Sequence, residues 1–148
     1  MIKWTLLLFT LFCLLLTRNS FGGQEQSEVS CLTEAIYYES RGETLMSQLA
    51  VGTVIMNRVR IDNYPSTVCN VVHQGCQFSY YCDGKPENML DKTAKAMSLS
   101  TAQFVLSGAS VWGLDNATHY HAYYVEPKWS KVFKYLQRVG SHLFYQGK

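Results

Sequence analysis

A carboxylate continues the apolar face of the first helix that the sequence predicts. Four residues recur at the i, i+3, i+4 and i+7 spacing of one helical face, namely Leu32, Ala35, Ile36 and Glu39. A carboxyl group on an apolar face loses hydration, so its charged form is disfavoured and its pKa rises. Because a carboxyl that keeps its proton near neutral pH can act as a general acid, Glu39 is a candidate catalytic residue. The alternative is a salt bridge from Glu39 to Arg41 or Arg58.

Hydrolysis of a glycosidic bond usually takes two carboxylates, and spacing alone places no second carboxylate beside Glu39. Glu43 follows Gly42, which interrupts the helix, and Glu34 lies roughly 140° round the helix. Asp83 sits at a predicted turn, from where it could approach across a cleft. The sequence therefore favours a mechanism with one carboxylate, in which a hydroxyl of the substrate replaces water.

His119 and His121 raise the alternative of a zinc enzyme such as a peptidase or amidase. Positions i and i+2 of a strand share a face, so the two imidazoles, which are common zinc ligands, could converge. A third ligand would come from one of four residues: Glu39, His73, His142 or Asp83. The other interpretation is a hydrogen-bonded pair that lines a cleft.

Aromatic side chains alternate with polar ones in two segments, 77–82 and 119–124. The aromatic residues are Phe78, Tyr80, Tyr81, Tyr120, Tyr123 and Tyr124, and the polar ones are Gln77, Ser79, His119 and His121. This pattern suits a sugar ring, which has one apolar face and a rim of hydroxyl groups, and it also suits an ordinary core. A glycan-binding protein without catalytic activity would show it too.

The pattern along the chain predicts an α+β fold that is mainly helical, with a small sheet. We expect helices near residues 30–41, 44–60, 66–72, 87–106 and 128–136, and strands near 77–82, 118–125 and 141–145. The second helix is apolar nearly all round, as is typical of a buried central helix. Thr53, a polar exception in it, either faces the site or bonds to the carbonyl one turn earlier.

The N-terminus has the three zones of a secretory signal. Lys3 precedes an apolar run of about a dozen residues, and small residues follow near Gly22, whereas a membrane-spanning helix needs roughly 20 residues. We therefore expect a signal peptide over 1–22, a flexible leader over 23–29 and a single catalytic domain over 30–148. No membrane anchor is expected after cleavage, and the protein is expected in the periplasm or secreted.

Composition limits the class of protein. The 148 residues are 47% apolar and 16% charged, which excludes a disordered or collagen-like chain. Without the signal the chain has 11 basic and 11 acidic residues, so nucleic-acid binding is disfavoured. We expect a monomer without a cofactor.

Four cysteines remain after processing: Cys31, Cys69, Cys76 and Cys82. An even number in an exported domain favours two disulfides. Three pairings are possible, and proximity along the chain favours Cys31–Cys69 with Cys76–Cys82.

Several motifs resemble the SleB-type cell wall hydrolase family. They are AIYYESRGE at 35–43, QLAVGTVIMNRV at 48–59, Gln77-Phe78-Ser79 with Asp83-Gly84, ATHYHA at 117–122, Pro127 with Trp129, and Gly140, His142, Phe144 and Tyr145. The order is preserved from about residue 31 to 145. Ser40 departs from the alanine common in the family, and we expect no peptidoglycan-binding repeat ahead of the domain.

The resemblance implies an enzyme that cuts peptidoglycan glycan strands, with a core similar to lytic transglycosylases and goose-type lysozymes. The family's catalytic glutamate maps to Glu39 and its helix-borne threonine to Thr53. Joined to the residue patterns, this gives a lytic transglycosylase that cleaves between N-acetylmuramic acid and N-acetylglucosamine. Five residues are expected to bind the glycan: Thr53, Gln77, Ser79, Tyr120 and His121. A zinc-dependent N-acetylmuramoyl-L-alanine amidase and a non-catalytic glycan-binding protein are the alternatives.

Overall fold

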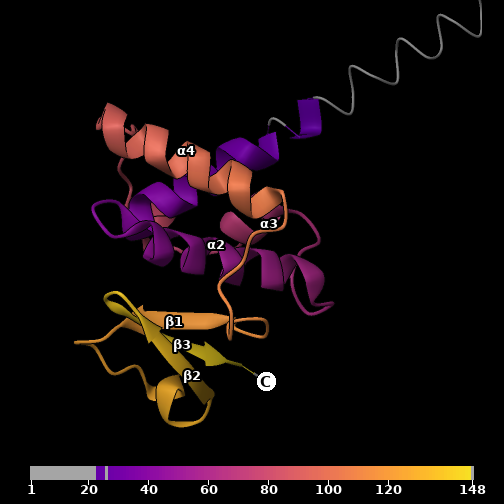
Figure 1. Cartoon of the computed structure of the whole chain (residues 1–148), viewed down its shortest axis with the longest axis vertical. Coiled ribbons are helices and arrows are strands. Elements are labelled where there is room, and N and C mark those ends of the chain that lie inside the picture. Colours follow the sequence, from indigo (N-terminus) through magenta and orange to yellow (C-terminus); the bar gives the residue numbers. More distant parts are fainter. Residues whose placement is uncertain (1–22, 26, 148) are drawn as a thin grey trace, which may run out of the picture.

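The computed structural model describes residues 23–25 and 27–147 (Figure 1). The signal peptide expected over 1–22 lies outside this range. The first helix covers residues 27–40 and is followed by α2 (Leu45–Arg60), α3 (Val68–Val72), the 3₁₀ helix η1 (Ser79–Cys82) and α4 (Lys92–Leu106). The C-terminal part holds β1 (His119–Ala122), the 3₁₀ helix η2 (Lys128–Lys131), β2 (Lys134–Val139) and β3 (His142–Gln146). This arrangement confirms the mainly helical α+β fold with a small sheet.

Over the range that the structure describes, no helix combines the length and apolar character that crossing a bilayer requires.

The helix α2 lies at the centre of the molecule. Thr44 caps its first turn, because its hydroxyl accepts a hydrogen bond from the Ser47 backbone N–H at 3.3 Å. Most of its residues are buried, as its apolar sequence predicts, and Figure 1 shows it between α4 and the sheet. Gly52 lets α4 approach closely, since a Cβ there would lie 2.7 Å from a methyl group of Val105.

The sheet has the strand order β1-β3-β2, and both pairings are antiparallel. Tyr120 of β1 lies opposite Phe144 of β3, which is fully buried against the helices. The register places Tyr120 on the face of β1 that meets the helical part. A shift in register between Tyr135 and Gln137 marks an irregularity in β2.

Polar residues of α2 hold the segment that leads into β1. Asn57 donates hydrogen bonds to the carbonyls of Leu114 and Ala117 at 2.7 and 2.8 Å, and Arg58 Nε donates to the Thr118 carbonyl at 2.8 Å. Because all these groups are buried, losing one partner would leave the other unsatisfied away from water. The start of β1 is therefore fixed to the C-terminal half of α2.

The strand predicted over 77–82 is wrong, because this segment is irregular and then forms η1. The Cys76–Cys82 disulfide is the physical reason. Its Cα atoms lie 5.6 Å apart, whereas six extended residues would span about 20 Å. The alternating pattern was a real feature of the sequence, but it is incompatible with the disulfide that the sequence also favoured.

Two predicted helices have different limits or a different structure. The helix predicted over 87–106 begins only at Lys92, because Asp91 caps it through the Ala94 backbone N–H at 2.9 Å. The helix predicted over 128–136 is wrong beyond its first turn: η2 ends at Lys131, and β2 begins at Lys134 and pairs with β3. Pairing with a neighbouring strand thus overrides the local pattern.

The leader predicted over 23–29 is in part helical, since residues 23–25 and 27–29 have helical backbone. Two contacts with α3 hold this end of the first helix. Glu28 Oε2 accepts a hydrogen bond from the Val68 backbone N–H at 2.6 Å, and Cys31 is bonded to Cys69. The helix therefore begins ahead of Ser30, where the sequence predicted order to start.

The structure confirms the disulfide pairing Cys31–Cys69 and Cys76–Cys82. The first joins the first helix to α3 across 38 residues, and the second closes a short loop across six.

Removing the Cys31–Cys69 disulfide is expected to cost more stability than removing the other. Loop-closure entropy gives about 4 kcal/mol for the long loop and about 2 kcal/mol for the short one. Urea unfolding of the double serine variants at both pairs measures the difference, and each variant serves as the control for the other. Equal losses of unfolding free energy would contradict this entropic account.

Glu43 joins the turn before α2 to the turn between β2 and β3. Its carboxylate accepts hydrogen bonds from the Ser141 hydroxyl and, at 3.4 Å, from the Ser141 backbone N–H, and His142 Nδ1 lies 3.8 Å away. Burial alone would raise the pKa of Glu43, but the Ser141 hydrogen bonds and His142 outweigh it and hold the pKa below its ordinary value. The ionised carboxylate therefore stabilises the contact between helices and sheet.

Glu43→Gln is expected to lower the free energy of unfolding by about 1–2 kcal/mol at pH 7. Since the folded-state pKa of Glu43 is depressed, its contribution is present above the unfolded pKa and is lost as the pH falls through the folded one. The difference between variant and parent should therefore shrink below about pH 4. Urea unfolding from pH 3 to 7 measures it, and a difference independent of pH would refute this role.

Candidate functional site

A hydrogen bond between the first helix and β1 defines the centre of the site. Tyr120 donates its hydroxyl proton to Glu39 Oε2 at 2.9 Å, across 81 residues of sequence. Both residues are half-buried, so the pair lies at the boundary between the core and a surface pocket. The carboxyl group of Glu39 is thus partly removed from water, as its position on the apolar face of the helix predicted.

Burial raises the pKa of Glu39, and the Tyr120 hydrogen bond and the charge of Arg58 only partly oppose it. No second carboxylate contributes to this shift. The alternative of a salt bridge is not found: among the residues described, no arginine nitrogen lies within 4.0 Å of the Glu39 carboxylate, and Arg41 instead donates to the Tyr37 hydroxyl at 3.1 Å. The arrangement suits a single carboxyl group that carries a proton.

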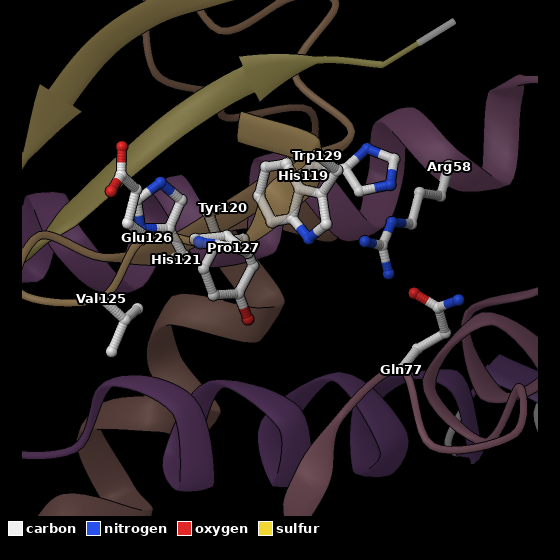
Figure 2. A pocket seen from close by; sticks show the side chains of 9 residues that line it. All are labelled: Arg58, Gln77, His119, Tyr120, His121, Val125, Glu126, Pro127 and Trp129. Carbon is white, nitrogen blue, oxygen red and sulfur yellow. The ribbon is translucent and has the colours of Figure 1, made fainter. Parts of the chain in front are cut away.

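A pocket of about 510 Å³ lies beside this pair (Figure 2). Its lining comes from the end of α2, the loop before η1, and the segment from β1 to η2: Arg58, Gln77, His119, Tyr120, His121, Val125, Glu126, Pro127 and Trp129. Figure 2 shows Arg58 and Gln77 at one end and Glu126 at the other, with the Tyr120 hydroxyl pointing between them toward the first helix.

Of the five residues expected to bind the glycan, the structure brings Gln77, Tyr120 and His121 to this pocket. Both nitrogens of His121 already have partners. Nδ1 lies 2.9 Å from the Ala122 carbonyl, and Nε2 lies 3.1 Å from the Tyr145 hydroxyl. Because a carbonyl only accepts, Nδ1 carries the proton, so His121 offers the pocket a ring edge rather than a free nitrogen.

Thr53 and Ser79 are not brought to the pocket. Thr53 is 1% exposed, donates to the Leu49 carbonyl at 2.8 Å and accepts from the Val111 backbone N–H at 3.1 Å. Its hydroxyl therefore fixes α2 to the segment before β1, which corrects the expectation that it binds substrate. Ser79 is exposed at the start of η1 and does not line the pocket.

Among the residues that the structure describes, no third ligand for a zinc ion lies beside His119 and His121. Within residues 23–25 and 27–147, no three His, Cys, Asp or Glu side chains converge in a way that could hold a metal ion. The ring of His119 packs against Trp129 and Phe133 instead.

Sequence reasoning missed the part that Arg58 plays in lining the pocket, because it considered Arg58 only as an ion partner of Glu39. His119 was considered both as a metal ligand and as one of a pair that lines a cleft, and it does line the pocket. Trp129 was considered only as part of a motif shared with the family. A signal for Arg58 was present, because it lies at i+3 and i+4 from the buried Ile55 and Val54 on a helix that is apolar nearly all round. No comparable signal marks Trp129, whose place depends on how η2 folds back onto β1.

The sequence model of the Cell Wall Hydrolase family matches residues 42–145, and the chain belongs to this family. The match begins three residues after Glu39, so it does not itself include the candidate acid.

Solved structures of SleB support the same class. The catalytic domain of the germination-specific lytic transglycosylase SleB from Bacillus anthracis is 30% identical, with a TM-score of 0.66 over 82% of this chain and 95% of that domain. The catalytic domain of the Bacillus cereus SleB protein gives a TM-score of 0.65, also at 30% identity, over 82% of this chain and 91% of that domain. The expected lytic transglycosylase-like core is therefore confirmed.

Full-length relatives are longer than this chain. The spore cortex-lytic enzyme of Bacillus cereus is 31% identical over 131 residues, which are 85% of this chain and 47% of that protein. The enzyme of Halalkalibacterium halodurans is 30% identical over 133 residues, 85% of this chain and 37% of that protein. The chain thus spans less than half the length of these relatives.

Tyr120→Phe is expected to raise the pKa of Glu39 further, because it removes a hydrogen bond that favours the ionised carboxylate. Titration of the Glu39 carboxyl carbon by NMR measures both pKa values. Tyr124→Phe, at an exposed tyrosine of the same segment, is the matched control and should leave the pKa unchanged. An unshifted or lowered pKa in Tyr120→Phe would contradict the assignment.

Proposed function

We propose that this protein cleaves the glycan strands of peptidoglycan at the bond between N-acetylmuramic acid and N-acetylglucosamine, as a lytic transglycosylase. The observation that carries the proposal is Glu39, a carboxyl group with a raised pKa that lies beside a pocket. No second carboxylate contributes to that shift, and the carboxylate that lines the pocket, Glu126, lies at its far end. The activities printed in the names of the SleB relatives support the same chemistry.

Glu39 serves in turn as acid and as base. Its protonated carboxyl donates the proton to the oxygen of the glycosidic bond while the bond from that oxygen to C1 of the muramyl residue breaks. The resulting carboxylate then takes the proton of the muramyl C6 hydroxyl, whose oxygen bonds to C1. Proton and bonds balance without water, and the product is a 1,6-anhydro sugar.

Glu39 must be protonated before the bond breaks and ionised after it, so its surroundings have to stabilise both forms. Burial keeps the proton on the carboxyl before bond cleavage, whereas the Tyr120 hydrogen bond and the charge of Arg58 stabilise the carboxylate that follows. Tyr120 in turn has a pKa raised well above its ordinary value by burial and by Glu39, so it remains a hydrogen-bond donor throughout.

The glycan would lie across the pocket that Figure 2 shows. Trp129 offers an aromatic face on which the apolar side of a sugar ring can pack, and Gln77 offers an amide for a hydroxyl or acetamido group. Tyr120, which donates to Glu39, and His121 also line this pocket. We place the action of this enzyme outside the cytoplasm, in the periplasm or after secretion, where the wall polymer is found.

Glu39→Gln is expected to lower the release of soluble glycan fragments from purified sacculi by about a hundredfold or more, because it removes the acid and the base together. Glu126→Gln makes the same change at the far rim of the pocket and should retain most of the activity. A Glu39→Gln variant that retained most activity would overturn the assignment.

Mass spectrometry of the same digest identifies the reaction. Anhydro-muramyl ends are expected from the wild-type protein, whereas new reducing ends would indicate hydrolysis. Free muramyl carboxyl groups, with loss of activity on adding a chelator, would indicate an amidase. Binding to sacculi with no soluble product would indicate a protein without catalytic activity.

A further inference from the structure

Arg58 leaves part of its charge unpaired at one end of the pocket. Its side chain is 4% exposed, and its hydrogen bond within the described residues is the one from Nε to the Thr118 carbonyl. Nη1 is buried with no partner, and no carboxylate lies within 4.0 Å of the guanidinium among these residues. The guanidinium carbon Cζ lies 5.5 Å from the centre of the Tyr64 ring and 5.6 Å from that of the Phe78 ring, and Figure 2 shows the terminal nitrogens on the side of Gln77, at the end of the pocket.

An unpaired buried cation is costly, and the one hydrogen bond that Arg58 gives to the fold, from Nε to the Thr118 carbonyl, leaves its terminal nitrogen Nη1 without a partner. Burial lowers the pKa of Arg58, as expected for a cation that is removed from water without a counterion. A ligand that brings a negative charge to this edge would offset that cost. The sugar hydroxyl and acetamido groups of a glycan backbone are neutral and would not.

His119 adds a second hydrogen-bond donor to the same end of the pocket. The Thr118 hydroxyl oxygen accepts from the Gly147 backbone N–H at 2.9 Å and lies 3.0 Å from His119 Nδ1. In the tautomer in which the Thr118 hydroxyl donates to Nδ1, the imidazole proton lies on Nε2. Burial and the charge of Arg58 lower the pKa of His119 to about 4, so the ring stays neutral in this form.

Gln77 completes the group from the opposite wall. Figure 2 shows its amide and the Arg58 guanidinium pointing toward each other, with the His119 ring beside them. The side chain of Gln77 is exposed. Arg58, His119 and Gln77 therefore present several N–H groups to one small volume, whereas the acidic Glu126 lies at the far end.

We propose that Arg58, with His119 and Gln77, forms a subsite for a carboxylate carried by the muramyl residue next to the cleaved bond. The inference rests on the proposed function and identifies which part of the wall polymer the pocket recognises. A muramyl residue can supply this chemistry from two sources: the lactyl carboxylate of a strand without peptides, or a carboxylate of the attached stem peptide. An arginine edge matches a carboxylate in shape as well as in charge.

Four soluble tetrasaccharide fragments of peptidoglycan test the subsite. One pair has no peptide and carries the lactyl group either as the free acid or as its methyl amide. The other pair carries a dipeptide whose carboxylates are either free or converted to methyl amides. Isothermal titration calorimetry on the Glu39→Gln variant measures the dissociation constant of each fragment without turnover.

In one pair the acid is expected to bind about tenfold to a hundredfold more tightly than its methyl amide, as for hydrogen bonds to charged groups. The pair that shows the difference identifies the source of the carboxylate. Gln77→Glu, added to Glu39→Gln, should abolish the difference, because the introduced carboxylate faces Arg58 and takes the place of that of the ligand. This position is exposed, so the change does not disturb the core.

Gln103→Glu, added in the same way, makes the identical change on the exposed surface of α4, outside the pocket, and should keep the difference. Acid and amide that bind within twofold of each other in both pairs would overturn the subsite. If wild-type protein still cleaved sacculi to anhydro products, the proposed function would stand without it. If no fragment bound and no cleavage occurred, both proposals would fall.

Discussion

The hydrogen bonds between α2 and the segment before β1 are the constraint on which the site depends. Asn57 holds two carbonyls of that segment, Arg58 holds a third, and Thr53 holds a backbone N–H, all in the buried interior. β1 can therefore take one position relative to the helices. That position brings Tyr120 within hydrogen-bond distance of Glu39, which lies on a different helix. The polar residues of the central helix thus assemble a site to which Thr53 and Asn57 do not themselves contribute a lining side chain.

The site is polarised along its length. Donor groups of Arg58, His119 and Gln77 lie at one end, Glu126 lies at the other, and Glu39 with Tyr120 lies between. Arg58 links two of these features. It holds β1 through the Thr118 carbonyl, and its positive charge partly opposes the effect of burial, which raises the pKa of Glu39. A single buried cation therefore contributes to the architecture, to the electrostatics of the acid and to the proposed recognition of the substrate.

Several features were predictable because they depend on local chemistry. A carboxylate on an apolar helical face must be partly buried, so the raised pKa of Glu39 followed from spacing. The two disulfides followed from cysteine proximity and the expected compartment. The same disulfide reasoning contradicted the strand predicted over 77–82, since a closed loop of six residues cannot be extended. Alternation of side chains alone did not contain that information.

The sequence by itself determined the central helix, the partly buried carboxyl group on the first helix and the family, because periodicity and ordered motifs are properties of the chain. Only the tertiary structure decided what the polar residues do. Thr53 looked like a candidate for substrate binding but is sealed inside, and Arg58 looked like a counterion but faces a pocket. Such roles depend on which distant backbone groups reach each side chain. Hydrogen bonds across nearly 60 residues, such as that from Val111 to Thr53, leave no local trace in the sequence.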